Sequence, residues 1–197
     1  MYKTKYFFLV YILLCAGCST VASVNRFQQG QYYYDRGIYT EAIKKYSEAI
    51  ESNPNLVEAY NNRGLSYGAI NKDDLAIEDF SRAIAINPLY ADAYNNRGLA
   101  YFRKKEYDSA KEDLNKALSI NPKYRGCGAY NNLGLVYFVQ QQYDLAIENF
   151  SKELELNPTC VAIINRSKAY HRTNQINKAE EDCSRAKKIF RKLDKCY

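Results

Sequence analysis

The chain has 197 residues, of which 47% are hydrophobic and 25% are charged. These fractions are typical of a soluble globular protein and exclude the composition of a disordered chain, and the length requires no more than one domain. The 20 tyrosines, 8 phenylalanines and absence of tryptophan indicate packing positions that accept a large ring with a polar edge.

The first 17 residues have the features of an export signal. Lys3 and Lys5 form a short positive segment, an apolar run follows from Tyr6 to Leu14, and Ala16-Gly17 supplies small residues for cleavage. This apolar region is shorter than the roughly 20 residues of a membrane-spanning helix. Removal of the signal leaves 26 basic and 22 acidic residues, a net charge of +4, which is too small to predict nucleic-acid binding.

A lipid anchor is predicted directly after the small pair. The segment Leu14-Cys15-Ala16-Gly17-Cys18 resembles the lipobox of bacterial lipoproteins, although Cys15 stands where that family usually has Leu. The resemblance implies that Cys18 is lipidated and becomes the mature N-terminus, and Ser19 after it resembles the outer-membrane sorting pattern of Gram-negative cells. The alternative, a Cys-x-x-Cys redox pair, is disfavoured because both cysteines lie inside the hydrophobic signal.

We therefore expect a signal peptide over residues 1–17, a short linker over 18–22 and a single folded region over 23–197. The expected location is the bacterial cell envelope, as an outer-membrane lipoprotein that faces the periplasm. The alternative location is a secreted or soluble periplasmic protein.

Internal repeats organise the folded region. Asn53-Pro54, Asn87-Pro88 and Asn121-Pro122 recur at intervals of 34 residues, and Asn157-Pro158 follows after 36. The segments Ala-Tyr-Asn-Asn-Arg-Gly-Leu at 59–65 and 93–99 are identical, and Ala-Tyr-Asn-Asn-Leu-Gly-Leu at 129–135 differs at one position. Such a period is the signature of stacked supersecondary units.

These segments resemble the tetratricopeptide repeat family, in which each repeat is a pair of antiparallel helices, A and B. The resemblance implies an all-α, right-handed superhelix, or solenoid, of about five helical hairpins. The expected repeats cover residues 23–56, 57–90, 91–124, 127–159 and 160–193. The fourth repeat carries Glu153 where the others have Ala, and the fifth has Ser167 in place of the repeated glycine.

The repeated residue types have physical roles that do not depend on the family name. Glycine and alanine let two helices approach closely, and an aromatic ring one turn away fills the space beside them. Asn-Pro ends helix B, because proline lacks a backbone donor and disfavours a helical residue before it. A single hairpin cannot bury its apolar stripe, so neighbouring repeats must stack and the ends must be capped. The Lys- and Arg-rich helix expected from about Asn177 to Leu193 suits such a cap.

Helix A is expected to line a concave groove, and its repeated residues would form ladders along it. The candidate groove residues are Asn61, Asn62, Leu65, Asn95, Asn96, Leu99, Phe102, Asn131, Asn132, Leu135, Phe138 and Asn165. The amides suit pairing with the backbone of an extended peptide, and an exposed apolar stripe is typical of a partner site. In the alternative interpretation the asparagines bond to neighbouring repeats and the apolar side chains pack into the core.

Charges near the groove favour one class of partner over another. Acids at Glu58 and Asp92 lie near one end of the groove, with Arg103, Lys168 and Arg172 toward the other, and they would orient a partner. Chaperone-binding members of the family clamp a terminal carboxylate with lysines, an arginine and asparagines. This sequence departs from that pattern, with leucines and acids at these positions, so recognition of a terminal carboxylate is disfavoured.

No catalytic set, metal site or cofactor site is predicted. His171 is the single histidine, so helical spacing cannot build a pair of histidine ligands, and each repeated glycine lies at a packing position. Cys127, Cys160, Cys183 and Cys196 could form disulfides in an oxidising periplasm, with the pairing left open.

The expected function is a non-enzymatic adaptor of the envelope that holds a peptide or helix of another protein. The alternative is a self-associating structural lipoprotein, in which the groove or the solenoid ends form a homo-oligomer.

Overall fold

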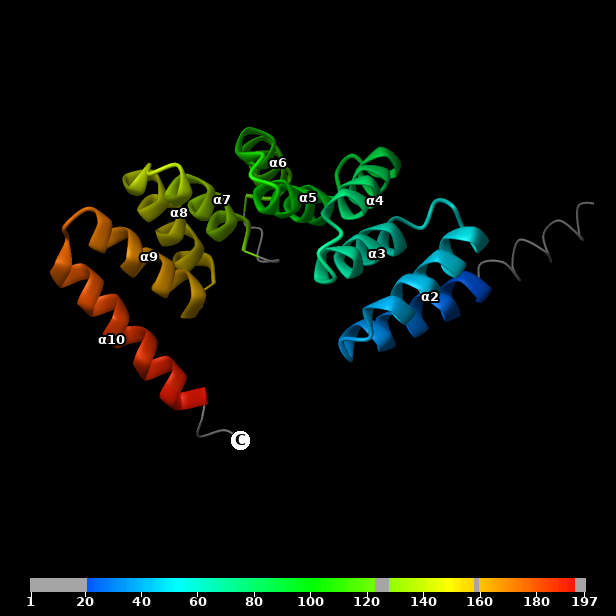
Figure 1. The fold of residues 1–197 in the computed structure, drawn as a ribbon, viewed down its shortest axis with the longest axis horizontal. Helices are drawn as coiled ribbons and strands as arrows, with labels where there is room; N and C mark the ends of the chain where they lie inside the picture. Colours follow the sequence, from blue (N-terminus) through cyan, green and yellow to red (C-terminus); the bar gives the residue numbers. More distant parts are fainter. Residues whose placement is uncertain (1–20, 123–127, 158–159, 194–197) are drawn as a thin grey trace, which may run out of the picture. The chain divides into compact units, whose positions relative to one another are not determined.

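The computed structural model describes residues 21–122, 128–157 and 160–193 of the chain (Figure 1). The predictions for the signal segment 1–17 and for Cys18, Cys127 and Cys196 lie outside these ranges. The described residues form helices and turns, without a strand. No helix within these ranges has both the length and the apolar character needed to cross a membrane.

Consecutive helices form antiparallel hairpins, which appear in chain order from blue to red in Figure 1. The first helix covers residues 21–35. Val21 and Ala22 are therefore helical, whereas the sequence predicts a linker over 18–22. The helices that follow are α2 (Tyr39–Ser52), α3 (Val57–Ala69), α4 (Asp73–Ile86), α5 (Ala91–Arg103), α6 (Tyr107–Ile120), α7 (Ala129–Val139), α8 (Tyr143–Leu156), α9 (Cys160–Arg172) and α10 (Ile176–Leu193).

Contacts divide the chain into two compact units, Met1–Ala93 and Tyr94–Tyr197. Helix α5 begins in the first unit and continues in the second. In the first unit, Ala49 and Ile50 of α2 pack with Ala59 and Tyr60 of α3 and with Ala83 of α4. Each repeat therefore completes the core of its neighbour, as expected for hairpins that cannot bury an apolar stripe alone.

A close contact between a glycine of helix A and a large side chain of helix B holds the hairpins together. The two residues are always sixteen apart in the sequence, and a Cβ added to the glycine would lie 2.5 to 2.9 Å from the large side chain. The pairs are Gly30 with Tyr46, Gly64 with Phe80, Gly98 with Leu114, and Gly134 with Phe150. The helix axes can approach this closely because one of the two side chains is absent.

The fifth hairpin keeps the same contact, with a larger residue on helix A and a smaller residue on helix B than in the other repeats. Ser167 replaces the glycine, and Cys183, sixteen residues later, replaces the ring. The Ser167 hydroxyl lies 3.2 Å from the Cys183 sulfur and donates to the Ala179 carbonyl at 2.9 Å. A larger side chain on helix A is thus offset by a smaller one on helix B.

Each helix A ends in the same tight turn. One residue of the turn has a left-handed backbone, with φ near +60 to +70°, at Gly37, Asn71, Lys105, Gln141 and Asn174. The next residue donates its backbone N–H to the carbonyl of the tyrosine five positions earlier, as in Glu106 to Tyr101 at 2.9 Å. This bond pattern is the Schellman motif, which satisfies carbonyls at the helix end.

Each described B-to-A junction begins at the asparagine that precedes proline, as the sequence predicted. The backbone is extended at Asn53, Asn87, Asn121 and Asn157, directly after α2, α4, α6 and α8. The Asn53 and Asn87 side chains accept the backbone N–H two residues later, at 3.1 and 3.0 Å. The all-α architecture of tandem hairpins is therefore confirmed.

Candidate protein-binding surface

The asparagine ladder lies largely inside the structure. Four of the predicted amides are buried, with exposed fractions of 0 to 7%: Asn61, Asn95, Asn96 and Asn132. Asn62, Asn131 and Asn165 are half-buried. The buried amides are therefore placed to join helices, and the half-buried ones are those that a partner could also reach.

Amide hydrogen bonds join the A helices of neighbouring repeats in the second unit. Asn132 Nδ2 donates to Asn95 Oδ1 at 3.1 Å, and Asn165 Nδ2 donates to Asn131 Oδ1 at 3.0 Å. The two bonds connect α5 with α7 and α7 with α9. The ladder thus fixes the spacing of the A helices, which is the separation that any peptide lying across them would meet.

The apolar ladder is divided between packing and exposure. Leu65, Leu99 and Leu135 are half-buried. Leu135 and Phe138 pack against a cluster that includes Phe150. The two predicted phenylalanines also lie against rings at the start of helix B, with centroids 6.0 Å apart for Phe102 and Tyr107 and 5.4 Å apart for Phe138 and Tyr143.

Exposed valines on helix A were not among the predicted groove residues. Val24, Val139 and Val161 are 50%, 45% and 59% exposed. Val24 and Val161 occupy the helix position of Glu58 and Asp92 in other repeats, and Val139 that of Arg103. Aligning the helices by the 34-residue period would therefore have placed these valines on the same face of helix A.

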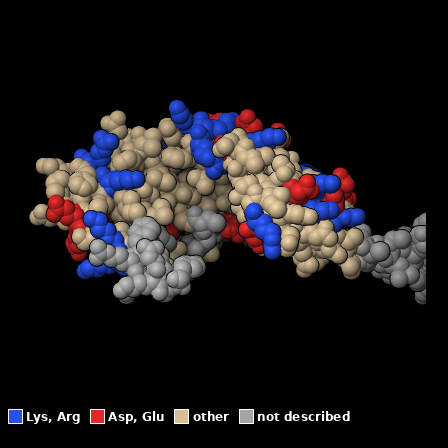
Figure 2. All heavy atoms as spheres, turned by 60° about the horizontal axis from the view of Figure 1, so that its bottom comes forward, with Lys and Arg blue, Asp and Glu red and all other residues tan. Residues whose placement is uncertain are grey.

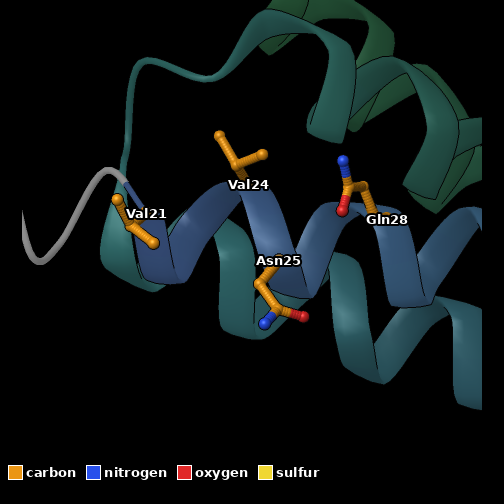
Figure 3. A pocket seen from close by; sticks show the side chains of 4 residues that line it. All are labelled: Val21, Val24, Asn25 and Gln28. Carbon is orange, nitrogen blue, oxygen red and sulfur yellow. The ribbon is translucent and has the colours of Figure 1, made fainter.

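A hollow adjoins the helix over residues 21–35 in the first unit (Figure 3). Its volume is about 440 Å³, and Val21, Val24, Asn25 and Gln28 line it. Val24 and Gln28 project to one side of the helix and Asn25 to the other. Gln28 takes the repeat position of Asn62, so this hollow extends the predicted groove face to the first repeat.

Three buried ion pairs connect helix A with helix B of the same repeat. They are Arg63 with Asp79, Arg97 with Asp113, and Arg166 with Asp182, each bidentate at 2.7 to 2.8 Å. Their partners are again sixteen residues apart. Arg63 and Arg97 lie in the repeated seven-residue segments, and the constant spacing to an aspartate was the signal that could have predicted these pairs.

The arginines also reach the preceding repeat. Arg63 Nη1 donates to the Ser47 hydroxyl of α2 at 2.9 Å, and Arg166 Nη1 donates to the Ser151 hydroxyl of α8 at 3.0 Å. Each of these two guanidinium groups therefore ties three helices together. The hydrogen bond with Asp113 raises the pKa of Arg97 above its already high ordinary value, so the guanidinium remains charged.

The fourth repeat lacks this ion pair because both members are replaced. Leu133 stands at the arginine position and Asn149 at the aspartate position, and both are buried. Asn149 Nδ2 donates to the Leu145 carbonyl at 2.8 Å, so its amide is satisfied without the arginine. The replacement removes both charges together and leaves no buried charge unpaired.

Within the described ranges, no group of three His, Cys, Asp or Glu side chains gathers as a metal site. His171 is exposed, and Cys183 is an exposed free thiol. On the face drawn in Figure 2, basic and acidic side chains lie interspersed.

Two family models match the chain. The model described as tetratricopeptide repeat matches residues 91–124 and 128–160, and the model described as TPR repeat matches residues 30–71 and 69–105. A curated relative, Hsp70-Hsp90 organizing protein 3 of Arabidopsis thaliana, is 46% identical over 48 residues. That stretch is 24% of this chain and 8% of the relative.

Solved structures extend the likeness over most of the chain. The crystal structure of MamA is 28% identical, with a TM-score of 0.71, over 84% of this chain and 96% of that one. The first TPR domain of Spaghetti (RPAP3), bound to the HSP90 peptide SRMEEVD, is 27% identical with a TM-score of 0.59. That likeness covers 62% of this chain and 95% of the other. The predicted fold class is confirmed by these similarities.

We expect the Arg97 pair to behave as a unit. Arg97→Leu leaves Asp113, which is 5% exposed, without its partner and should lower the free energy of unfolding by about 2–4 kcal/mol. The double variant Arg97→Leu/Asp113→Asn copies the fourth repeat and should recover at least half of that loss. Urea denaturation followed by circular dichroism measures both. Lys152→Gln breaks the exposed pair with Glu148 and is the control, with an expected loss below about 1 kcal/mol. A double variant no more stable than Arg97→Leu contradicts the expectation.

The buried Glu153 should make stability depend on pH. It is 3% exposed, its Oε2 has no hydrogen-bond partner among the described residues, and burial raises the pKa of its carboxyl. A raised folded-state pKa favours the protonated form, so its contribution to stability is lost as the pH rises through that pKa. Glu153→Gln should therefore gain stability relative to the natural chain as the pH is raised from about 4 to 8. Denaturation midpoints across that range test this, and a difference independent of pH would contradict it.

Proposed function

Because the chain belongs to the tetratricopeptide repeat family, we propose that it is a non-enzymatic scaffold that holds a peptide or helix of another protein against its A helices. The observation that carries the proposal is that the A helices of each unit present exposed valines beside half-buried amides and leucines. Exposed apolar side chains beside half-buried amides suit a partner that offers both a backbone and apolar side chains. The peptide-bound Spaghetti domain supports the same use of the repeat.

We also propose that the scaffold acts in a bacterial cell envelope, anchored by lipid at Cys18 and facing the periplasm from the outer membrane. Support for the anchor comes from the sequence, where the charged, apolar and small segments occur in the order of an export signal and end at Cys18. The folded repeats begin within three residues of this cysteine, since residues 21 onward are helical. A lipid there would hold the first repeat near the membrane surface.

The alternative, self-association through stacked ends, is opposed by the residues at those ends. The second to fifth repeats carry a fully buried alanine where the first repeat has the exposed Asn25: Ala59, Ala93, Ala129 and Ala162. Likewise, Leu118 and Leu154 are nearly buried where α10 has the exposed Lys187. Polar side chains at stacking positions would be desolvated by another copy, so they favour capped ends.

The groove assignment is tested by capture from an envelope extract with the mature protein. The variant Val24→Ser/Val139→Ser/Val161→Ser should lose proteins that the natural chain retains, because it removes apolar contact at the exposed positions of helix A. The matched control, Leu75→Ser/Leu89→Ser/Leu145→Ser, changes exposed apolar residues elsewhere and should retain them. Thermal unfolding verifies that both variants fold. An identical set of captured proteins with all three would contradict the groove assignment.

The anchor is tested by fractionation of the full chain expressed in a Gram-negative bacterium. The natural chain should require detergent for release from membranes, and Cys18→Ser should appear in soluble fractions after the loss of its lipid. Cys15→Ser is the matched control and should remain bound. Incorporation of labelled palmitate should follow the same pattern. Detergent-dependent release of Cys18→Ser would contradict lipid anchoring.

A further inference from the structure

The second unit presents a surface that favours one class of peptide, which specifies the partner further than the proposed function does. We define the α7–α9 face by residues at matching helix positions i, i+3 and i+7, which share one side of a helix. These are Asn132, Leu135 and Val139 on α7 and Asn165, Lys168 and Arg172 on α9. The bond from Asn165 to Asn131 joins the two helices along this face.

Positive charge on this face has no counterpart on the helices that form it. Helix α7 carries no charged residue, and α9 carries no acid. Arg166 of α9 turns away from the face, since it pairs with Asp182 of α10 and donates to Ser151 of α8. Lys168 and Arg172 remain exposed and form no ion pair with a described residue.

The A helices of the first unit, over residues 21–35 and α3, carry basic and acidic residues in equal number, and Arg36 directly follows the first of them. Their arginines are occupied by other groups: Arg26 bonds to Ser52, Arg36 stacks on Tyr32, and Arg63 pairs with Asp79. The acid Glu58 is exposed in the first turn of α3. The positive charge is therefore particular to the second unit and is not a property of every repeat.

Apolar surface adjoins the two cations. Val139 is 45% exposed at the position that corresponds to Arg172, and Val161, one turn before Asn165 on α9, is 59% exposed. Leu135, at the position that corresponds to Lys168, is half-buried against the Phe150 cluster. The face thus places the two cations of α9 beside the apolar side chains of α7, with the half-buried Asn165 three residues before Lys168.

We propose, resting on the proposed scaffold function, that the α7–α9 face binds an extended peptide segment in which acidic and apolar side chains alternate. Lys168 and Arg172 are four residues apart, a rise of about 6 Å along the helix. Side chains on one side of an extended strand are separated by about 6.6 Å, so two alternate carboxylates match the two cations. The apolar side chains that alternate with them point to the other side of the strand, toward Leu135 and Val139 on α7. Asn165, which is half-buried, offers its amide to the peptide backbone.

The test uses two end-capped fluorescent peptides of equal length, one alternating Glu with apolar residues and one with Gln in place of each Glu. The end caps remove the terminal carboxylate, so that any preference comes from side chains. Fluorescence anisotropy with the mature chain should show the acidic peptide binding roughly five-fold more tightly at low salt, with the preference falling as salt rises.

The variant Lys168→Gln/Arg172→Gln should abolish the preference, because both cations are replaced by polar side chains without charge. Lys187→Gln/Lys188→Gln makes the same charge change at exposed positions of α10 in the same repeat and should preserve it. Val139→Ser should weaken both peptides equally. Equal affinities for the two peptides, or a preference that survives the Lys168/Arg172 change, would overturn the inference.

Failure of this inference is distinguishable from failure of the scaffold function. If the Gln peptide binds as tightly as the acidic one, the face binds peptides but does not select charge. If neither peptide binds, the α7–α9 assignment fails, while capture of envelope proteins still decides the broader function. Binding to phosphatidylglycerol vesicles that depends on Lys168 and Arg172, without a peptide preference, would assign the face to lipid and overturn the peptide.

Discussion

The structure depends on close approach of two helices within each hairpin. A glycine of helix A leaves room for a ring or leucine of helix B sixteen residues later. The arginine one position before Gly64, Gly98 or Ser167 meets an aspartate at the same spacing. Both contacts require the same turn length and the same rotation of each helix. The left-handed residue in every A-to-B turn supplies that constant geometry. Packing, charge pairing and turn conformation therefore support one another, which gives a repeat a single arrangement.

Once the hairpins are set, the exposed surface is what remains of helix A. The arginines turn toward helix B, and much of the asparagine ladder joins neighbouring repeats. The side chains that remain accessible to a partner are exposed valines, half-buried leucines and amides, and Lys168 and Arg172, which form no ion pair with a described residue. The scaffold thus keeps its strongest polar interactions for its own cohesion and offers a partner mainly apolar contact and long-range charge.

Much of the fold could be predicted from the sequence, because a period of 34 residues and Asn-Pro at each boundary define the hairpins. The site was harder to predict, since a repeat period assigns equivalent positions without revealing which face each one occupies. The asparagines drew notice as identical pairs, yet Asn95 is fully buried and Asn62 is not. Val24, Val139 and Val161 were missed because they break the repeat pattern, and a search for repetition overlooks residues that differ. Leu133 and Asn149 are explained together, because the arginine and aspartate at the equivalent positions of the third repeat form a bonded pair.

The sixteen-residue coupling has a consequence for how such a chain can change over time. If an arginine stood at position 133 and an aspartate at position 149, replacing only one of them would leave a buried charge without its partner. A ring at position 183 opposite Ser167 would overfill the contact between the two helices. The tolerable order of substitution is therefore the one in which one side chain becomes smaller before its partner becomes larger. In the ion pair, the carboxylate is neutralised before the cation is lost. Whole hairpins, in contrast, carry both members of every couple with them, so duplication is an easier route to diversity than single replacement.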